Sequence, residues 1–262
     1  MKRILLSLST LFFSGVLFAQ NPTPNSGFEN WNTIIPVSGN PYDSLHEWNT
    51  LNFKTNVLGI YTCQKATGVD AHTGQYAAKF ITKQPFGIIA NGIASTAELI
   101  TTPPYGVTGG TPFTQRPDSI IGWFKNTPQN GDTAFIELVL FDSISGDRVG
   151  WATYDITGAH STYQRFSSPV TYYNSNNPNM CYWILSSSGR VTKFLNSTLF
   201  VDDIAMVYNG TGMSAEAFQN VTAYYNNTDK TFCFDANGYV LDLNMMNLEG
   251  KTVYQSRSEE HT

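Results

Sequence analysis

The strongest constraint on the fold is a series of short segments rich in β-branched and aromatic residues, separated by turn clusters of Gly, Pro and Asn. No long segment after residue 19 has helical periodicity. Short strands with regular turn signals are typical of an all-β sandwich or barrel. The clearest predicted strands are Gln75–Ile81, Ser119–Lys125, Thr133–Phe141, Arg148–Ile156, Tyr163–Tyr173, Met180–Ser186 and Leu199–Tyr208.

The segment Thr133–Phe141 shows how such a strand divides into two faces, because successive side chains of a strand point in opposite directions. One face is wholly apolar and is expected to pack between two sheets; it holds Ala134, Ile136, Leu138 and Leu140. The other face is aromatic with one carboxylate; it holds Phe135, Glu137, Val139 and Phe141. In a jelly roll, such a second face is either covered by loops or lines a ligand groove.

The composition is poor in charge and slightly acidic. Charged residues make up 13% of the chain and the net charge is −5, whereas ordinary soluble domains contain about 25% charged residues. A protein that binds nucleic acid needs a basic surface. The composition therefore argues against a nucleic-acid partner, and the polar uncharged surface is typical of secreted β proteins.

The N-terminus has the organisation of a secretory signal peptide over residues 1–19. Lys2 and Arg3 precede a mostly apolar run, Ile4–Phe18, and Ala19 is a small residue before the expected cleavage point. The alternative is a membrane anchor, but the run is short for a span of about 20 residues. We expect a chain without a transmembrane span that is exported to the periplasm and then secreted or held at the cell surface.

The three cysteines, Cys63, Cys181 and Cys233, do not make a disulfide framework because their number is odd. A Cys63–Cys181 bridge is one alternative in an oxidising compartment. Buried free thiols, which behave as small apolar residues, are the alternative that we favour. The cysteine and histidine spacing gives no zinc or iron motif.

Several segments together resemble a known family. Asn25–Trp31 (NSGFENW) resembles the opening strand of galactose-binding-like jelly rolls, and Ala71–Ala78 (AHTGQYAA) resembles the strand that follows. With Ser119–Pro128 and Ser197–Asp203, these segments are similar to a secreted Bacteroidetes family named "putative carbohydrate metabolism domain". The resemblance implies that residues 20–208 form a carbohydrate-binding-like jelly roll; it implies no catalytic residue.

A second resemblance follows a Gly- and Asn-containing linker at residues 209–219. Asn220–Tyr225, Tyr239–Leu243 and Asn247–Val253 resemble parts of a type IX secretion sorting domain. The usual Pro-Asn-Pro and the final strands are missing, so residues 220–256 are interpreted as a truncated, small β module that directs export. Arg257–Thr262 (RSEEHT) resembles a translated sequencing adapter, and we expect these residues to be an artefact that replaces the natural C-terminus.

A structural calcium site is implied by the jelly-roll resemblance. Glu29 and Asp202 match the positions where a glutamate of the first strand meets an aspartate of the last, and the backbone near Thr73 would add oxygen ligands. On an ideal strand Asp202 would face inward with Ile204, and Asp203 would face outward. A bulge would reverse that arrangement. The alternative is that these carboxylates cap turns or form ion pairs.

Glycan binding needs aromatic faces for sugar C–H surfaces and a few polar groups for hydroxyls. The candidate residues for such contacts are Trp123, Phe135, Glu137, Trp151, Tyr154 and Trp183. The alternative is that these aromatic residues are core, since a sandwich buries most of its aromatic side chains.

The sequence therefore predicts a secreted, non-catalytic protein that recognises a polysaccharide or cell-surface glycan. The alternative is a structural or adhesive surface protein without a sugar site, and a carbohydrate-active enzyme comes third. Glycoside hydrolysis needs two carboxyl groups that flank the scissile bond, but Glu137 and Asp142 are predicted on opposite faces of one strand. His46, His72 and His160 do not lie in a motif of known catalytic context, and the remaining histidine, His261, belongs to the expected artefact.

Overall fold

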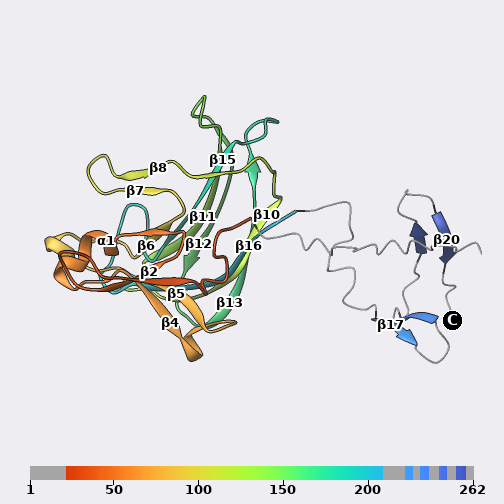
Figure 1. Cartoon of the computed structure of the whole chain (residues 1–262), viewed down its shortest axis with the longest axis horizontal. Coiled ribbons are helices and arrows are strands. Elements are labelled where there is room, and N and C mark those ends of the chain that lie inside the picture. Colours follow the sequence, from red (N-terminus) through yellow and green to blue (C-terminus); the bar gives the residue numbers. More distant parts are fainter. Residues whose placement is uncertain (1–21, 209–221, 227–230, 236–241, 247–251, 258–262) are drawn as a thin grey trace, which may run out of the picture. The chain divides into compact units, whose positions relative to one another are not determined.

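The computed structural model describes residues 22–208, 222–226, 231–235, 242–246 and 252–257. The chain divides into two compact units, Met1–Tyr208 and Asn209–Thr262 (Figure 1). The predicted signal peptide, the linker and residues 258–262 of the predicted artefact lie outside the described residues. Within the described ranges, no helix has both the length and the apolar character needed to cross a membrane.

The first unit is an antiparallel jelly-roll β-sandwich, so the predicted all-β class is confirmed. One sheet has five strands, in the order β13 (His160–Pro169), β10 (Ser119–Thr127), β16 (Thr198–Val207), β5 (Tyr76–Ile81) and β4 (Cys63–Thr67). The other has seven strands, along the path β14 (Thr171–Tyr172), β12 (Arg148–Thr157), β11 (Thr133–Phe141), β15 (Met180–Ser186), β6 (Ile93–Ser95) and β3 (Asn49–Thr50), with β9 (Thr111–Pro112) also paired to β15.

Smaller elements surround the sandwich. Two hairpins are formed by β1 (Trp31–Ile34) with β2 (Tyr42–Leu45), and by β7 (Glu98–Ile100) with β8 (Gly106–Thr108). The only described helical turns are short: α1 (Asn52–Thr55), η1 (Asn56–Leu58), η2 (Gly68–Asp70) and η3 (Pro85–Gly87). These elements are too short and too polar for hydrophobic periodicity to identify them in the sequence.

The core lies between the two sheets and takes one face of each long strand. On β11, Ala134, Ile136, Leu138 and Leu140 are at most 1% exposed, which confirms the predicted inward face. Rings from both sheets meet them in one cluster, which includes Phe80, Phe124, Phe166 and Trp183. Burial of this apolar surface, at about 25 cal/mol per Å², is the main stabilising contribution that holds the sheets together.

Both described cysteines are buried in this core as free thiols. Cys63 lies on β4 and Cys181 on β15, so the sequence alternative of a bridge between them is wrong. Burial raises the pKa of Cys181 to about 12, and that of Cys63 is raised for the same reason. The side chain of Cys233 lies outside the described residues.

The second unit contains two separate hairpins among its described residues. They are formed by β17 (Thr222–Asn226) with β18 (Thr231–Asp235), and by β19 (Asp242–Met246) with β20 (Thr252–Arg257). The strands β17, β19 and β20 overlap the segments that resemble a sorting domain. The role of this unit in export stays a prediction.

Candidate functional site

The face of the seven-stranded sheet that points away from the core gathers aromatic and charged side chains. In an antiparallel ladder, directly paired residues lie on the same face. Glu137 of β11 pairs with Thr153 of β12 and Ile184 of β15, so the face runs across three strands. We call outer face the surface formed by Phe135, Glu137, Trp151, Thr153, Asp155 and Tyr182.

Arg190, from the loop between β15 and β16, binds the polar part of the outer face. Its Nη2 donates to Glu137 Oε2 at 2.7 Å and to Thr153 Oγ1 at 2.8 Å, and its Nη1 donates to Asp155 Oδ1 at 3.0 Å. The guanidinium also lies 3.9 Å from the centre of the Phe135 ring. Arg190 therefore ties together β11 and β12 on the side away from the core.

The charges at this network are partly accessible. The Arg190 and Asp155 side chains are 42% and 53% exposed, whereas Glu137 is only 11% exposed. Burial lowers the pKa of Arg190, but its hydrogen bonds to Glu137 and Asp155 outweigh that effect and hold the pKa above its ordinary value. The guanidinium stays charged at any pH at which the protein folds, so a ligand meets a fixed cation between two carboxylates.

The loop that carries Arg190 is held by a buried aspartate. Asp132 is 3% exposed. Its carboxylate accepts four hydrogen bonds, from Ser188 Oγ (2.5 Å), Phe194 N (3.1 Å), Gly189 N (3.1 Å) and Thr133 N (2.8 Å). Burial raises the pKa of Asp132, but hydrogen bonds with Ser188, Ser197, Gly189 and Phe194 outweigh it and leave the pKa below its usual range. Asp132 therefore fixes the loop before Arg190, at Ser188 and Gly189, and after it, at Phe194.

Aromatic rings continue the outer face beside this network. Trp151 is half-buried, its ring lies 5.7 Å from the Arg148 guanidinium, and its indole N–H has no hydrogen-bond partner among the described residues. Tyr182 packs against Phe141 with ring centres 5.7 Å apart. Burial, and then the charge of Glu137, raises the pKa of Tyr182. The face thus combines apolar ring surface with donors and acceptors.

The structure places three of the six predicted glycan-contact residues, Phe135, Glu137 and Trp151, on this one face. Tyr154 and Trp183 point to the core instead: Trp183 is fully buried, and Tyr154 packs 5.3 Å from Phe166. Neither Tyr154 nor Trp183 can contact a sugar on the outer face, because both side chains lie on the core side of the seven-stranded sheet.

Trp123, the sixth predicted residue, lies on β10 in the other sheet. Its ring stacks on the His72 imidazole, with centres 4.1 Å apart and planes at 20°. Sequence reasoning missed Thr153, Asp155, Tyr182 and Arg190. The alternation of β12 places Thr153 and Asp155 with Trp151, so two of these four had a detectable signal.

The two carboxylates predicted to bind calcium both contact the segment 72–75, which includes Thr73. Asp202 is fully buried; its Oδ2 accepts hydrogen bonds from His72 N at 2.9 Å and Thr73 N at 3.3 Å. Glu29 Oε1 accepts from the backbone N–H of Gln75 at 3.0 Å. Asp203 binds the same loop, through His72 Nδ1 at 2.7 Å and Thr73 Oγ1 at 2.9 Å.

A bulge in β16 changes the expected direction of Asp202. The register against β10 shifts between Ile121 and Trp123, and Asp203 has a positive φ of 48°. Asp202 pairs with Trp123 and points away from the core, whereas Ile204 points into it. The expectation that both face inward on an ideal strand is therefore wrong, and the bulge alternative holds.

These carboxylates have the donor chemistry that calcium prefers, and backbone oxygens near Thr73 would have to complete the shell. All are oxygen donors, which Ca²⁺ prefers. In the described part of the chain, however, no three Asp, Glu, His or Cys side chains converge as a metal shell. Glu29 and Asp202 accept backbone N–H bonds, and a calcium ion would use the lone pairs that remain on their carboxylates. Burial, and to a smaller extent the charge of Asp203, raises the pKa of Asp202 to about 6, and the hydrogen bond from His72 N opposes that rise.

Fold and site together define a jelly-roll sandwich with an aromatic and charged sheet face, and comparisons with known proteins agree on the fold. No family model matches the chain, and no curated protein matches it. A "putative glycoside hydrolase" from Bacteroides vulgatus has a similar structure, with a TM-score of 0.59 at 17% identity over 69% of this chain and 96% of that one. Another so described, from Bacteroides thetaiotaomicron, gives 0.57 at 14% identity over 71% of each chain. At such identities the likeness concerns the fold alone.

Proposed function

We propose that this protein is a secreted, non-catalytic glycan-binding protein and that a carbohydrate chain lies across the outer face. The single observation that carries the proposal is the position of the Arg190 network beside the half-buried rings of Trp151 and Tyr182. Arg190 and Thr153 supply donors, and Glu137 and Asp155 supply acceptors, on one side of Trp151.

Sugars present two kinds of surface, and the outer face has a counterpart for each. Hydroxyl groups both donate and accept hydrogen bonds, and charged partners make the stronger bonds. The axial C–H groups of a sugar ring pack against aromatic rings such as Trp151 and Tyr182. A mostly apolar surface with few fixed polar groups is the usual form of a small-molecule site.

The arrangement of carboxylates supports binding more than hydrolysis. A glycoside hydrolase needs one carboxyl group to donate a proton and a second to act as base or nucleophile. Glu137 and Asp155 are the two carboxylates of the outer face, and both bind the same guanidinium. Each carboxylate uses one oxygen for Arg190, so the guanidinium holds both groups together instead of on opposite sides of a bound sugar.

Two proteins of known structure with this fold are each described as a "putative glycoside hydrolase", and that description concerns those proteins and not this chain. A structural or adhesive protein without a sugar site would have the same fold. It would not need the partly exposed Arg190 and Asp155 beside aromatic rings on one sheet face, so the Arg190 network favours binding.

Export is part of the proposal. Residues 1–19 would direct the chain to the periplasm, and residues 220–256 would address it to the type IX secretion machinery. The glycan would then be met outside the cell, as free polysaccharide or on a cell surface.

We also propose that calcium binds at Glu29, Thr73 and Asp202 and stabilises the contact between the first and last strands. The supporting observation is that the described residues provide no Lys or Arg ion pair for Glu29, Asp202 or Asp203. A cation that binds only the folded state raises the melting temperature. Thermal unfolding with added calcium and with chelator tests this: calcium should raise Tm, and equal values would contradict the proposal.

Affinity electrophoresis tests the proposed function. The purified protein is run through gels that contain plant, algal or host polysaccharides, with a gel without polysaccharide as reference. Retardation by one glycan class is expected. No retardation by any glycan, with a folded sample, would contradict glycan binding. Release of reducing ends that is lost in Glu137→Gln would contradict the non-catalytic part.

A further inference from the structure

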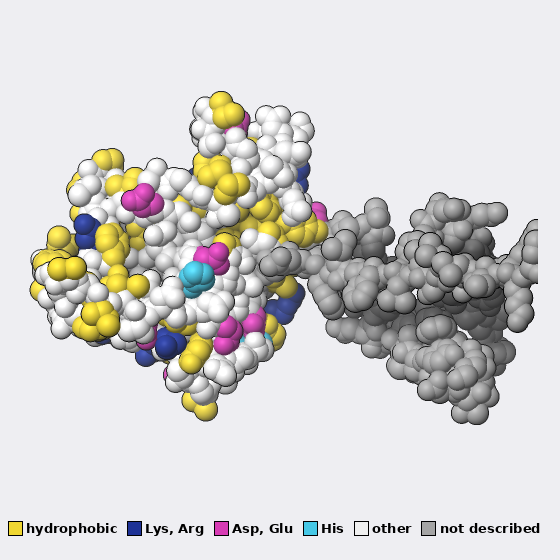
Figure 2. All heavy atoms as spheres, viewed as in Figure 1, with side chains coloured by type: hydrophobic (Ala, Val, Ile, Leu, Met, Phe, Trp, Pro, Cys, Tyr) yellow, Lys and Arg dark blue, Asp and Glu magenta, His cyan; other side chains and the backbone are white. Residues whose placement is uncertain are grey.

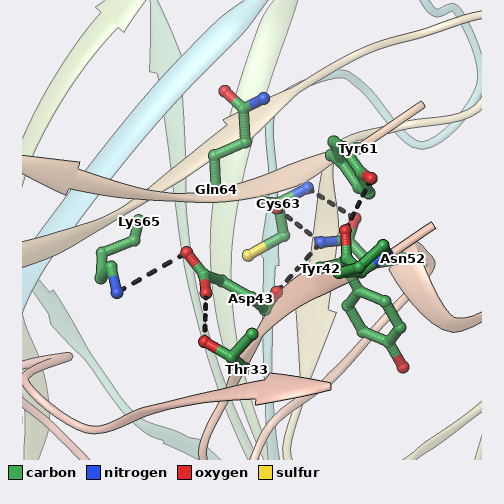
Figure 3. A pocket seen from close by; sticks show the side chains of 9 residues that line it. Thr33, Tyr42, Asp43, Asn52, Tyr61, Cys63, Gln64 and Lys65 are labelled. Carbon is green, nitrogen blue, oxygen red and sulfur yellow. Dashed lines mark hydrogen bonds and ion pairs between the residues drawn. The ribbon is translucent and has the colours of Figure 1, made fainter. Parts of the chain in front are cut away.

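A cleft of about 380 Å³ lies away from the outer face, between the β1–β2 hairpin and β4, the edge strand of the five-stranded sheet. Its volume is at the small end of the range of about 300–1,000 Å³ that is usual for small-molecule sites. Thr33, Asp43, Tyr61 and Lys65 are among the residues that line it (Figure 3).

Three of these side chains form a polar row across the cleft. Thr33 Oγ1 donates to Asp43 Oδ1 at 3.1 Å, and Lys65 Nζ lies 3.6 Å from Asp43 Oδ2 (Figure 3). The last distance is too long for a good hydrogen bond. Lys65 also lies over the Tyr76 ring at 5.0 Å, but no hydrogen-bond acceptor for its ammonium is found among the described residues.

Both charged groups are accessible while they face each other. The Lys65 side chain is 27% exposed and that of Asp43 is 38% exposed. The walls behind them are fixed by hydrogen bonds: Asn52, buried at 1% exposure, donates to Cys63 O, and Tyr61 donates from its hydroxyl to Pro41 O. A rigid wall with open donors and acceptors is preorganised for a ligand, which lowers the entropic cost of binding.

The opposite charges of Asp43 and Lys65 decide the class of ligand. A charged ligand would have to break the Asp43–Lys65 pair and compete with one of its members. An uncharged ligand with neighbouring hydroxyl groups can join the pair without breaking it, because one hydroxyl donates to the Asp43 carboxylate and the next accepts from the Lys65 ammonium. Sugars present such adjacent hydroxyls around the whole ring.

We propose that this cleft is a second binding site, which takes a single neutral sugar unit or the end of a glycan chain through adjacent hydroxyls on Asp43 and Lys65. It is independent of the outer face, because no residue is shared between the two. Two sites on one domain would allow the protein to bind one glycan at two points, which increases avidity without new contacts.

The test is an NMR titration of the ¹⁵N-labelled full-length protein with methyl glycosides of glucose, galactose, mannose and xylose. At least one glycoside is expected to shift the backbone amides of Thr33, Asp43 and Lys65. Neutral-sugar binding should not depend on salt, since screening acts on charged partners. Glucuronate and glycine serve as charged reference ligands in the same titration. Shifts with these ligands alone, or no shift at the cleft with any neutral sugar, would overturn the proposal.

Matched variants separate the cleft from the outer face. Lys65→Met should weaken cleft binding by about tenfold, the effect of one lost hydrogen bond to a charged group. Lys54→Met removes the same charge outside the cleft and should leave the affinity unchanged. Asp43→Asn keeps the shape and should also weaken binding; unchanged affinity in both cleft variants would overturn the proposal.

The two proposals fail in different ways. Tyr182→Ala should leave the cleft shifts intact, because Tyr182 lies on the other sheet. If the outer face binds no glycan, the cleft shifts of the wild type remain as evidence for the second site. If Tyr182→Ala abolishes them, the cleft is not an independent site and this inference is wrong.

Discussion

The Arg190 guanidinium lies 3.9 Å from the centre of the Phe135 ring and donates a hydrogen bond to Glu137, two residues further along the same strand. One loop residue therefore contacts an aromatic ring and a carboxylate on a single strand face. The surface beside Trp151 is organised around this contact. Removal of the Arg190 side chain should therefore weaken glycan binding in a protein that still folds.

Arg190→Met should weaken glycan binding by about tenfold or more, because it removes charged hydrogen-bond donors from the outer face. The free energy of unfolding should fall by about 1–3 kcal/mol, because Glu137 is only 11% exposed and loses its charged partner. Affinity electrophoresis and chemical denaturation measure the two effects. Arg165→Met, on exposed β13 of the other sheet, is the matched control. An equal loss of binding in both variants would contradict a specific role for Arg190.

Asp132→Ala should destabilise the protein by about 2–4 kcal/mol, because it leaves buried donors at Ser188, Gly189 and Phe194 unpaired. Urea denaturation measures the change. The variant should also bind glycan more weakly, since the loop that carries Arg190 loses its anchor. A stable variant with unchanged affinity would show that Asp132 does not position the loop.

The pKa of Asp132 also predicts a dependence on pH. Its folded value is lowered, so its stabilising effect is complete above the unfolded value of about 3.9 and is lost as pH falls through the folded value. The difference in unfolding free energy between wild type and Asp132→Asn should therefore shrink in acid. A difference that grows as pH falls below about 3.9 would contradict this sign.

Asp202 should give the unfolding free energy a pH dependence of the opposite sign. Its pKa in the folded protein is raised to about 6, so the folded state binds its proton more tightly than the unfolded state. Its contribution to stability is complete below the unfolded value of about 3.9 and is lost as pH rises to about 6. The stability of wild type relative to Asp202→Asn should fall across this window, in calcium-free buffer. A rise across it would contradict the assignment.

The thiols of Cys63 and Cys181 should be inert in the folded protein, because burial raises their pKa values and excludes reagents. A Cys233→Ser variant leaves only these two cysteines. We expect no reaction with a thiol reagent under native conditions and two equivalents after unfolding without reductant. Two thiols that appear only after reduction would instead show a Cys63–Cys181 disulfide.

Periodicity predicted the long strands and one core face well. Alternation of Ala134, Ile136, Leu138 and Leu140 fixed the inward face of β11, since only one of its faces is wholly apolar. The same rule applied to β12 would have placed Tyr154 in the core, because it shares a face with Ala152 and Ile156. The assignment of Tyr154 to the glycan-contact residues could therefore have been recognised as wrong from the sequence alone.

Other features were beyond the reach of a single sequence. Both faces of β15 are apolar, so alternation alone could not decide whether Trp183 or Tyr182 points to the core. The contact of Arg190 with Glu137 joins residues 53 positions apart and depends on strand pairing. The bulge at Asp203 has no signature except a residue with positive φ, which the sequence does not display.

Surface charge gives no simple guide to the site. On the side of the molecule shown in Figure 2, Lys and Arg side chains are few and scattered. Binding that depends on sugar hydroxyls and ring surface should therefore change little with ionic strength, unlike binding to a polyanion. Electrophoresis at low and high salt checks this, and a loss of retardation at high salt would indicate an acidic ligand instead.

The most direct test of the central claim is titration calorimetry of the retarding glycan with wild type and with the double variant Trp151→Ala, Tyr182→Ala. Circular dichroism first establishes that the variant is folded. If the outer face binds the glycan, the double variant should lose at least about tenfold in affinity, because both ring surfaces are gone. Unchanged affinity in a folded double variant would show that the glycan binds elsewhere and would contradict the account.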